Sequence, residues 1–76
     1  MREGTLFFNT RINKLDIYFD DETTYGGLNC GDEIEVLISD EISQPKWELA
    51  RIEYSDDLGW YLKGCKASEF DLTVRI

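Results

Sequence analysis

The stretch YGGLNCGDEIEV, residues 25–36, combines the residue types that could do chemistry: one thiol, three glycines and three acids. Glycine-rich loops bind phosphate when a lysine and a serine or threonine follow the last glycine. Here Asp32 and Glu33 follow Gly31, and their negative charges would repel a phosphate. The stretch therefore does not predict a nucleotide site.

The two thiols, Cys30 and Cys65, are the other reactive groups. A nucleophilic thiol needs a base or a cation beside it, whereas the charged residues next to Cys30 in the sequence are the acids Asp32 and Glu33. The chain has no histidine, which removes Ser-His-Asp and Cys-His catalysis. We therefore predict no catalytic residue, no cofactor and no enzyme activity.

Structural roles for both thiols are expected, in the reduced form that a cytosol maintains. Two alternatives stay open. One is a disulfide between Cys30 and Cys65. The other is a metal site made of Cys30, Cys65, Asp32 and Glu69, although the C-x₂-C spacing typical of zinc sites is absent.

The glycines favour a simpler interpretation of the stretch, in which it forms a corner of a small barrel. Gly26, Gly27 and Gly31 permit positive φ where a loop turns into a strand. Leu28 and Cys30 would then be small apolar residues that fill the end of the barrel.

The elements that would position these residues are strands, because apolar residues alternate with polar ones in most of the chain. Strands are predicted at 5–9, 14–20, 32–38, 47–54, 60–64 and 72–76. The residues expected to face inward are Leu15, Ile17, Phe19, Ile34, Val36, Ile38, Val74 and Ile76, whereas Asp16, Tyr18 and Asp20 are expected to face outward. SDDLG reads as a hairpin loop, and the segment around Pro45 as a long loop.

This pattern predicts an all-β fold: a small SH3-like barrel of five to six short antiparallel strands, with one short 3₁₀ turn within 66–72 before the last strand. The 76 residues suffice for one domain, spanning 1–76. No apolar run is long enough to span a membrane, and the start MREGTLFF lacks a signal-peptide pattern. We expect a monomer in the bacterial host cytosol.

The charge is unevenly distributed. Residues 15–45 contain nine of the sixteen acids and no lysine or arginine, so most of the net charge of −8 belongs to this segment. Such a field repels nucleic acid and attracts basic surfaces. Residues two apart on a strand share a face at about 6.6–6.8 Å, so Glu33 and Glu35 could imitate successive phosphates. The alternative is an acidic surface that serves only solubility.

The aromatic residues Trp47, Tyr54, Trp60 and Tyr61 form a second feature. Both phases of strand 47–54 carry apolar side chains, so we expect one tryptophan in the core and the other on the surface as an interface anchor. Base stacking on these rings would need a basic groove, which the composition does not supply.

Three strings, GTLFFN, YGGLNCGDEIEVLI and ARIEYSDDLGWYLKG, resemble a family of small uncharacterised proteins of phages and integrative elements of Gram-positive bacteria, known only as a domain of unknown function. The resemblance covers nearly the whole chain, although the SDEISQP segment departs from the compact pattern. It implies an SH3-like all-β module of a mobile element and implies no activity.

In size and charge, the chain also resembles anti-CRISPR proteins, by type rather than by motif. That resemblance implies a non-enzymatic inhibitor that binds a basic nucleic-acid-handling protein, such as a type II CRISPR effector nuclease, and blocks nucleic-acid loading. The contacts predicted for it are Asp16, Asp20, Asp21, Glu22, Glu33, Glu35 and Trp60. Five of these acids are expected to lack basic partners: Asp20, Asp21, Glu22, Glu33 and Glu35. The alternative is an SH3-like regulatory adapter that binds a protein or peptide through surface aromatics.

Overall fold

The computed structural model describes residues 2–38, 44–64 and 72–76. Within these residues the protein is all-β, and no helix is present, so none could cross a membrane. Six strands occur in chain order: β1 (Glu3–Asn9), β2 (Lys14–Phe19), β3 (Glu33–Ile38), β4 (Lys46–Ser55), β5 (Gly59–Lys63) and β6 (Thr73–Arg75).

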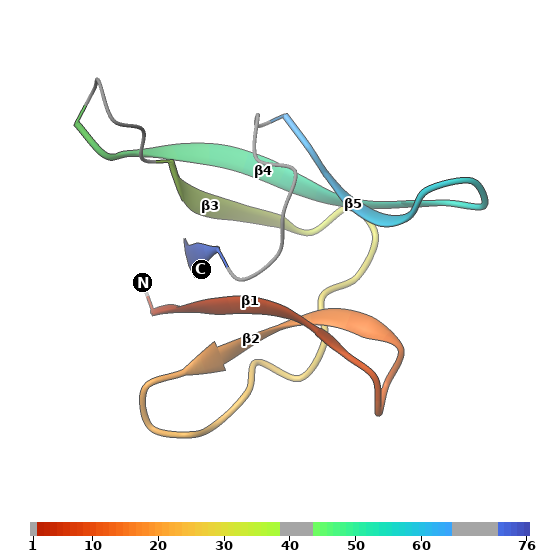
Figure 1. The fold of residues 1–76 in the computed structure, drawn as a ribbon, viewed down its shortest axis with the longest axis horizontal. Coiled ribbons are helices and arrows are strands. Elements are labelled where there is room, and N and C mark those ends of the chain that lie inside the picture. Colours follow the sequence, from red (N-terminus) through yellow and green to blue (C-terminus); the bar gives the residue numbers. More distant parts are fainter. Residues whose placement is uncertain (1, 39–43, 65–71) are drawn as a thin grey trace.

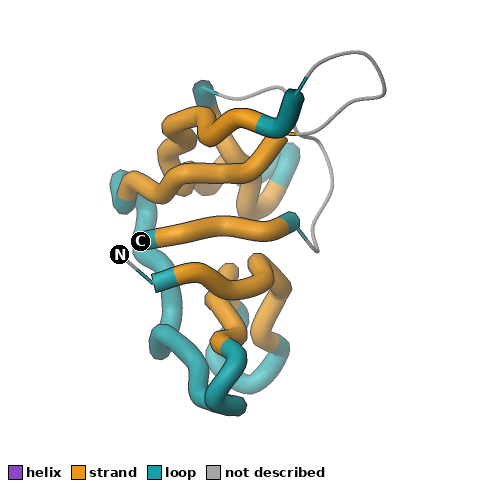
Figure 2. Tube along the Cα trace, turned by 90° about the vertical axis from the view of Figure 1, so that its left-hand side faces the viewer, coloured by secondary structure: helices purple, strands orange, loops and turns teal. Residues whose placement is uncertain are grey.

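All six strands belong to one antiparallel sheet in the order β2-β1-β6-β3-β4-β5. The short strand β6, blue in Figure 1, lies between the β1–β2 pair and the β3–β4–β5 group. The same stacking of strands is visible from the side in Figure 2. Since no ladder joins β2 to β5 in the described residues, the sheet is open, and the closed SH3-like barrel is not confirmed. The predicted 3₁₀ turn lies outside the described residues.

The predicted strands agree with the observed ones within two residues at every end. The alternation also predicted the inner face correctly. Of the eight residues expected to face inward, six are buried, and Ile38 and Ile76 pack against them half-buried. The buried apolar core consists of Leu6, Leu15, Ile17, Phe19, Leu28, Ile34, Val36, Ala50, Ile52 and Val74.

Cross-strand pairs on the inner face build this core across the whole sheet. Ile17 lies opposite Leu6, and Val36 lies opposite Val74. Ile52 lies opposite Leu62. Because β6 contributes Val74 between the two groups of strands, it joins them into one core.

The chain after β2 turns back along this strand and covers its outer edge. The amide of Tyr25 donates to the carbonyl of Ile17 at 2.9 Å, and the amide of Leu28 donates to the carbonyl of Leu15 at 2.7 Å. Residues 29–32 then reach β4, where the amide of Gly31 donates to the carbonyl of Ile52 at 2.7 Å. The β2–β3 loop thus ties the two groups of strands together.

Candidate functional site

Asp16 lies at the centre of the glycine loop. Its predicted outward direction is confirmed, but its expected exposure to solvent is wrong. Its side chain leaves β2 on the outer face, but the returning loop covers it completely. The carboxylate oxygen Oδ1 accepts hydrogen bonds from the amides of Ile17, Gly26 and Gly27 at 2.8, 2.9 and 3.0 Å. The other oxygen, Oδ2, accepts one from the side-chain amide of Asn9 at 3.0 Å.

These hydrogen bonds decide the charge state of Asp16. Burial alone raises the pKa of a carboxyl group. Here the bonds from the Asn9 side chain and from the backbone of Ile17, Gly27 and Gly26 outweigh the burial, so the pKa of Asp16 is lowered. Asp16 is therefore a charged structural residue that holds the loop, and it is not available to a partner.

The glycines have the role that the sequence suggested. Gly26 and Gly27 have φ of 107° and 109°, a backbone conformation that glycine adopts more readily than other residues, and both amides donate to Asp16. Leu28 is buried as expected, but Cys30 is exposed, so its predicted packing role is wrong. The Cys30 thiol donates to the carboxylate of Glu53 at 3.5 Å.

The carboxylates predicted to bind a basic partner do not form one free row. Glu35 is half-buried, and Arg75 donates to both of its carboxylate oxygens at 3.3 and 3.0 Å. Asp21 forms an ion pair with Arg2 at 3.4 Å. The expectation that these acids lack basic partners is therefore wrong for Glu35 and Asp21. The reason is that Arg75 of β6 and Arg2, the residue before β1, are remote in sequence from these acids but lie beside them in the fold.

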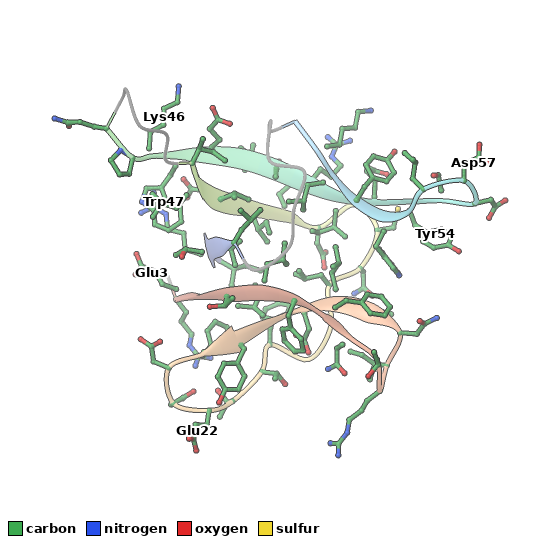
Figure 3. All side chains as sticks on the ribbon, in the orientation of Figure 1. Glu3, Glu22, Lys46, Trp47, Tyr54 and Asp57 are labelled. Carbon is green, nitrogen blue, oxygen red and sulfur yellow. The ribbon has the colours of Figure 1, made fainter. Side chains whose placement is uncertain are left out.

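Three acids remain together at an exposed position. Asp20, Asp21 and Glu22 follow β2 at the tip of the β2–β3 loop, and the Glu22 side chain points away from the molecule in Figure 3. The hydroxyl and amide of Thr23 hold the pKa of the Asp21 carboxyl below its ordinary value, and Arg2 adds to the effect. Glu33 is also exposed but lies opposite Arg51 on the neighbouring strand.

The alternative metal site is not built by the described residues. Cys30 and Asp32 belong to them, whereas Cys65 and Glu69 lie outside them, and so does the alternative disulfide. No group of three or more potential metal ligands occurs within 2–38, 44–64 and 72–76. The lack of a cofactor stays a prediction.

One tryptophan was predicted in the core and the other on the surface, but both are half-buried. Trp47 lies on the outer face of β4, where the guanidinium of Arg75 stacks over its ring at 4.1 Å from the ring centroid. Trp60 packs against the core from β5. Neither side chain is a fully exposed anchor.

Trp60 instead forms part of a groove between the β4–β5 hairpin and the first strand with its turn. The groove holds about 330 Å³ and is lined by Phe8, Asn13, Tyr54, Leu58, Gly59 and Trp60. Figure 3 shows Tyr54 on the side of the hairpin that faces β1 and β2. Three of the lining side chains are substantially exposed: Phe8 at 38%, Tyr54 at 51% and Leu58 at 71%.

The walls of this groove are held in place by internal contacts. The indole Nε1 of Trp60 donates to the backbone carbonyl of Asn13 at 3.1 Å, which spans the groove. The rings of Tyr54 and Trp60 meet edge to face with centroids 5.2 Å apart. The Ser55 hydroxyl accepts from the amide of Leu58 at 2.9 Å and fixes the hairpin turn. Because the polar atom of Trp60 is already bonded, the indole presents an apolar surface to the groove.

The tip of the hairpin that forms one wall of the groove is acidic. Asp56 and Asp57 are exposed at the tip of the hairpin, and Figure 3 shows Asp57 far from Glu22. None of the ion pairs formed among the described residues includes either aspartate. No described lysine or arginine lines the groove.

Sequence reasoning found only part of this surface. It singled out Trp60 and Tyr54. Phe8 and Leu58 lie within the strings GTLFFN and ARIEYSDDLGWYLKG, but neither they nor Asn13 were expected to bind a partner. One signal in the sequence was usable: Leu58 is an apolar residue within a polar hairpin loop, a position where solubility favours polar residues.

Comparison with known proteins identifies relatives of the chain but no activity. Residues 4–76 match the family described as "Domain of unknown function (DUF5348)". The chain is also similar to a crystal structure of a protein from Ruminococcus gnavus, with 45% sequence identity and a TM-score of 0.82. This match covers 99% of the present chain and 100% of the other. No curated protein matches the sequence.

Proposed function

The chain belongs to the DUF5348 family, whose function is unknown, and we propose that it is a non-enzymatic module that binds another protein through its aromatic groove. The observation that carries this proposal is the exposure of Phe8, Tyr54 and Leu58 around one preorganised groove. Aromatic side chains with rigid positions lose little conformational entropy on binding, which makes them effective interface anchors.

The size of the groove supports this choice over a cofactor site. Its volume of about 330 Å³ is at the lower end of the roughly 300–1,000 Å³ typical of small-molecule pockets. Such a space admits one or two side chains of a partner. The exposed residues at its edge, among them Leu58, would extend the contact beyond the pocket itself.

A capture experiment tests the proposal. The tagged protein is incubated with a lysate of the organism that encodes it, in parallel with a Tyr54→Ser plus Leu58→Ser variant. Both positions are exposed enough for the fold to tolerate the change, whereas Trp60 packs against the core and is left intact. We expect a protein that is retained by the wild type and lost with this groove variant.

A matched control removes two carboxylates elsewhere, by Asp20→Asn plus Glu22→Gln. These residues are exposed at the β2–β3 loop tip, and we expect the control to retain the partner. If the groove variant captures the same proteins as the wild type, the proposal fails.

A second candidate is supported by the exposed acids Asp20, Asp21 and Glu22 together with the net charge of −8. In this candidate, the loop tip occupies the basic nucleic-acid channel of a host effector and prevents loading. Loss of capture with Asp20→Asn plus Glu22→Gln, but not with the groove variant, would favour it. Its narrower form, a phage or mobile-element inhibitor of a type II CRISPR nuclease acting in the cytosol, stays a prediction.

A further inference from the structure

The side chains that line the groove and the charges next to it indicate which class of partner it binds. We propose that it binds a peptide segment in which an apolar side chain is flanked by lysine or arginine; this inference rests on the proposed function. The apolar side chain would enter between Phe8 and Tyr54 onto the indole of Trp60. The basic side chain would reach Asp56 or Asp57 at the tip of the β4–β5 hairpin.

The apolar part of this specificity follows from the lining of the groove. Phe8, Tyr54, Leu58 and Trp60 supply carbon surface, and the indole nitrogen is already bonded to the carbonyl of Asn13. A polar side chain would lose its hydration there without gaining a hydrogen bond from the indole, which is unfavourable. An aliphatic or aromatic side chain instead removes exposed apolar surface from water.

The basic part follows from the charges beside the groove. Asp56 and Asp57 are exposed and take part in none of the ion pairs that the described residues form. The groove lining itself has no charged side chain among the described residues. A lysine or arginine next to the apolar residue of the peptide could therefore reach two carboxylates. It would meet no repelling cation among the described residues that line the groove.

The same charges argue against a nucleic acid as the occupant. Stacking of bases on aromatic side chains requires a basic groove that follows the phosphate backbone. Here the groove has no basic side chain among its described lining residues, two carboxylates lie at the tip of the adjoining hairpin, and the whole chain has a net charge of −8. An acidic peptide is disfavoured for the same reason.

A selection from a displayed library of random short peptides tests the inference directly. The wild-type protein is the target, and the most enriched peptides are synthesised for titration. We expect their sequences to pair an apolar residue with a neighbouring lysine or arginine. Leu58→Ser should weaken their binding roughly fivefold or more, as expected for a central apolar contact.

Charge is tested with two variants that change the net charge equally. Asp56→Asn plus Asp57→Asn should weaken binding by roughly 2- to 30-fold, the range for two exposed ion pairs. Asp20→Asn plus Glu22→Gln, at the distant loop tip, should have a much smaller effect, because salt screens charges that are more than about 10 Å apart.

The outcomes separate the inference from the proposed function. Peptides that depend on Leu58 but lack basic residues, or that bind equally well without Asp56 and Asp57, would overturn the inference and leave the groove as a binding site. If the selection yields no peptide whose binding is weakened by Leu58→Ser, both the inference and the proposed function are wrong.

Discussion

Asp16 shows how a single residue can look functional in the sequence and prove structural in the fold. The alternation in β2 correctly places its side chain on the face opposite to Leu15 and Ile17. The burial of that face by Gly26 and Gly27 was not predictable, because it depends on a loop that returns ten residues later. A carboxylate there is stable because four hydrogen-bond donors replace its water.

Replacement of Asp16 by asparagine should destabilise the protein by about 1–3 kcal/mol at pH 7. The amides of Gly26 and Gly27 lose a charged acceptor, and the new side-chain amide opposes that of Asn9. Since the pKa of Asp16 is lowered in the folded state, its charge stabilises the fold above the unfolded pKa, and this contribution is lost as the pH falls through the folded pKa.

Urea unfolding of both proteins between pH 7 and acid pH measures this effect. The difference in free energy of unfolding between the wild type and the Asp16→Asn variant should be largest at pH 7. It should shrink as the pH falls below about 4, the pKa of an unfolded aspartate. A difference that stays constant with pH would contradict the assigned role.

At the scale of elements, the strands were predictable from the sequence, whereas their arrangement in an open sheet was not. β3 reads Glu-Ile-Glu-Val, and its alternation alone identifies the strand and its buried face. The order of strands depends on β6, whose three residues carry little pattern but pair with both β1 and β3. Phe8 and Tyr54 lie far apart in sequence, so no local pattern indicated that they share a groove.

Gly4 in β1 tests how closely the first two strands pack. A Cβ atom at this position would lie 2.5 Å from the carbonyl oxygen of Tyr18 and 2.6 Å from the side chain of Ile17. The backbone of β2 cannot move away cheaply, so Gly4→Ala should cost about 1–3 kcal/mol, as overpacking does.

Thr5→Ala, on the exposed face of the same strand, is the control and should change stability by no more than about 0.5 kcal/mol. Thermal unfolding of both variants compares them. Equal melting temperatures for Gly4→Ala and the wild type would show that β1 and β2 pack less closely than described here.

At the scale of the whole molecule, the sequence indicated the excess of negative charge but not its arrangement. Residues 15–45 read as one uninterrupted acidic surface. In the fold, one of these acids is buried, Glu35 and Asp21 are paired with arginines, and the loop tip is far from the hairpin acids. The pairing was not predictable, because Arg2 and Arg75 come from the two ends of the chain.

The most direct test of the groove as the binding site is a titration of the isotopically labelled protein with a selected peptide, followed by amide chemical shifts. We expect the largest shifts at Phe8, Asn13 and residues 54–60, with small shifts at residues 20–24. Largest shifts at residues 20–24, with the groove unchanged, would contradict the groove as the binding site and favour the acidic loop.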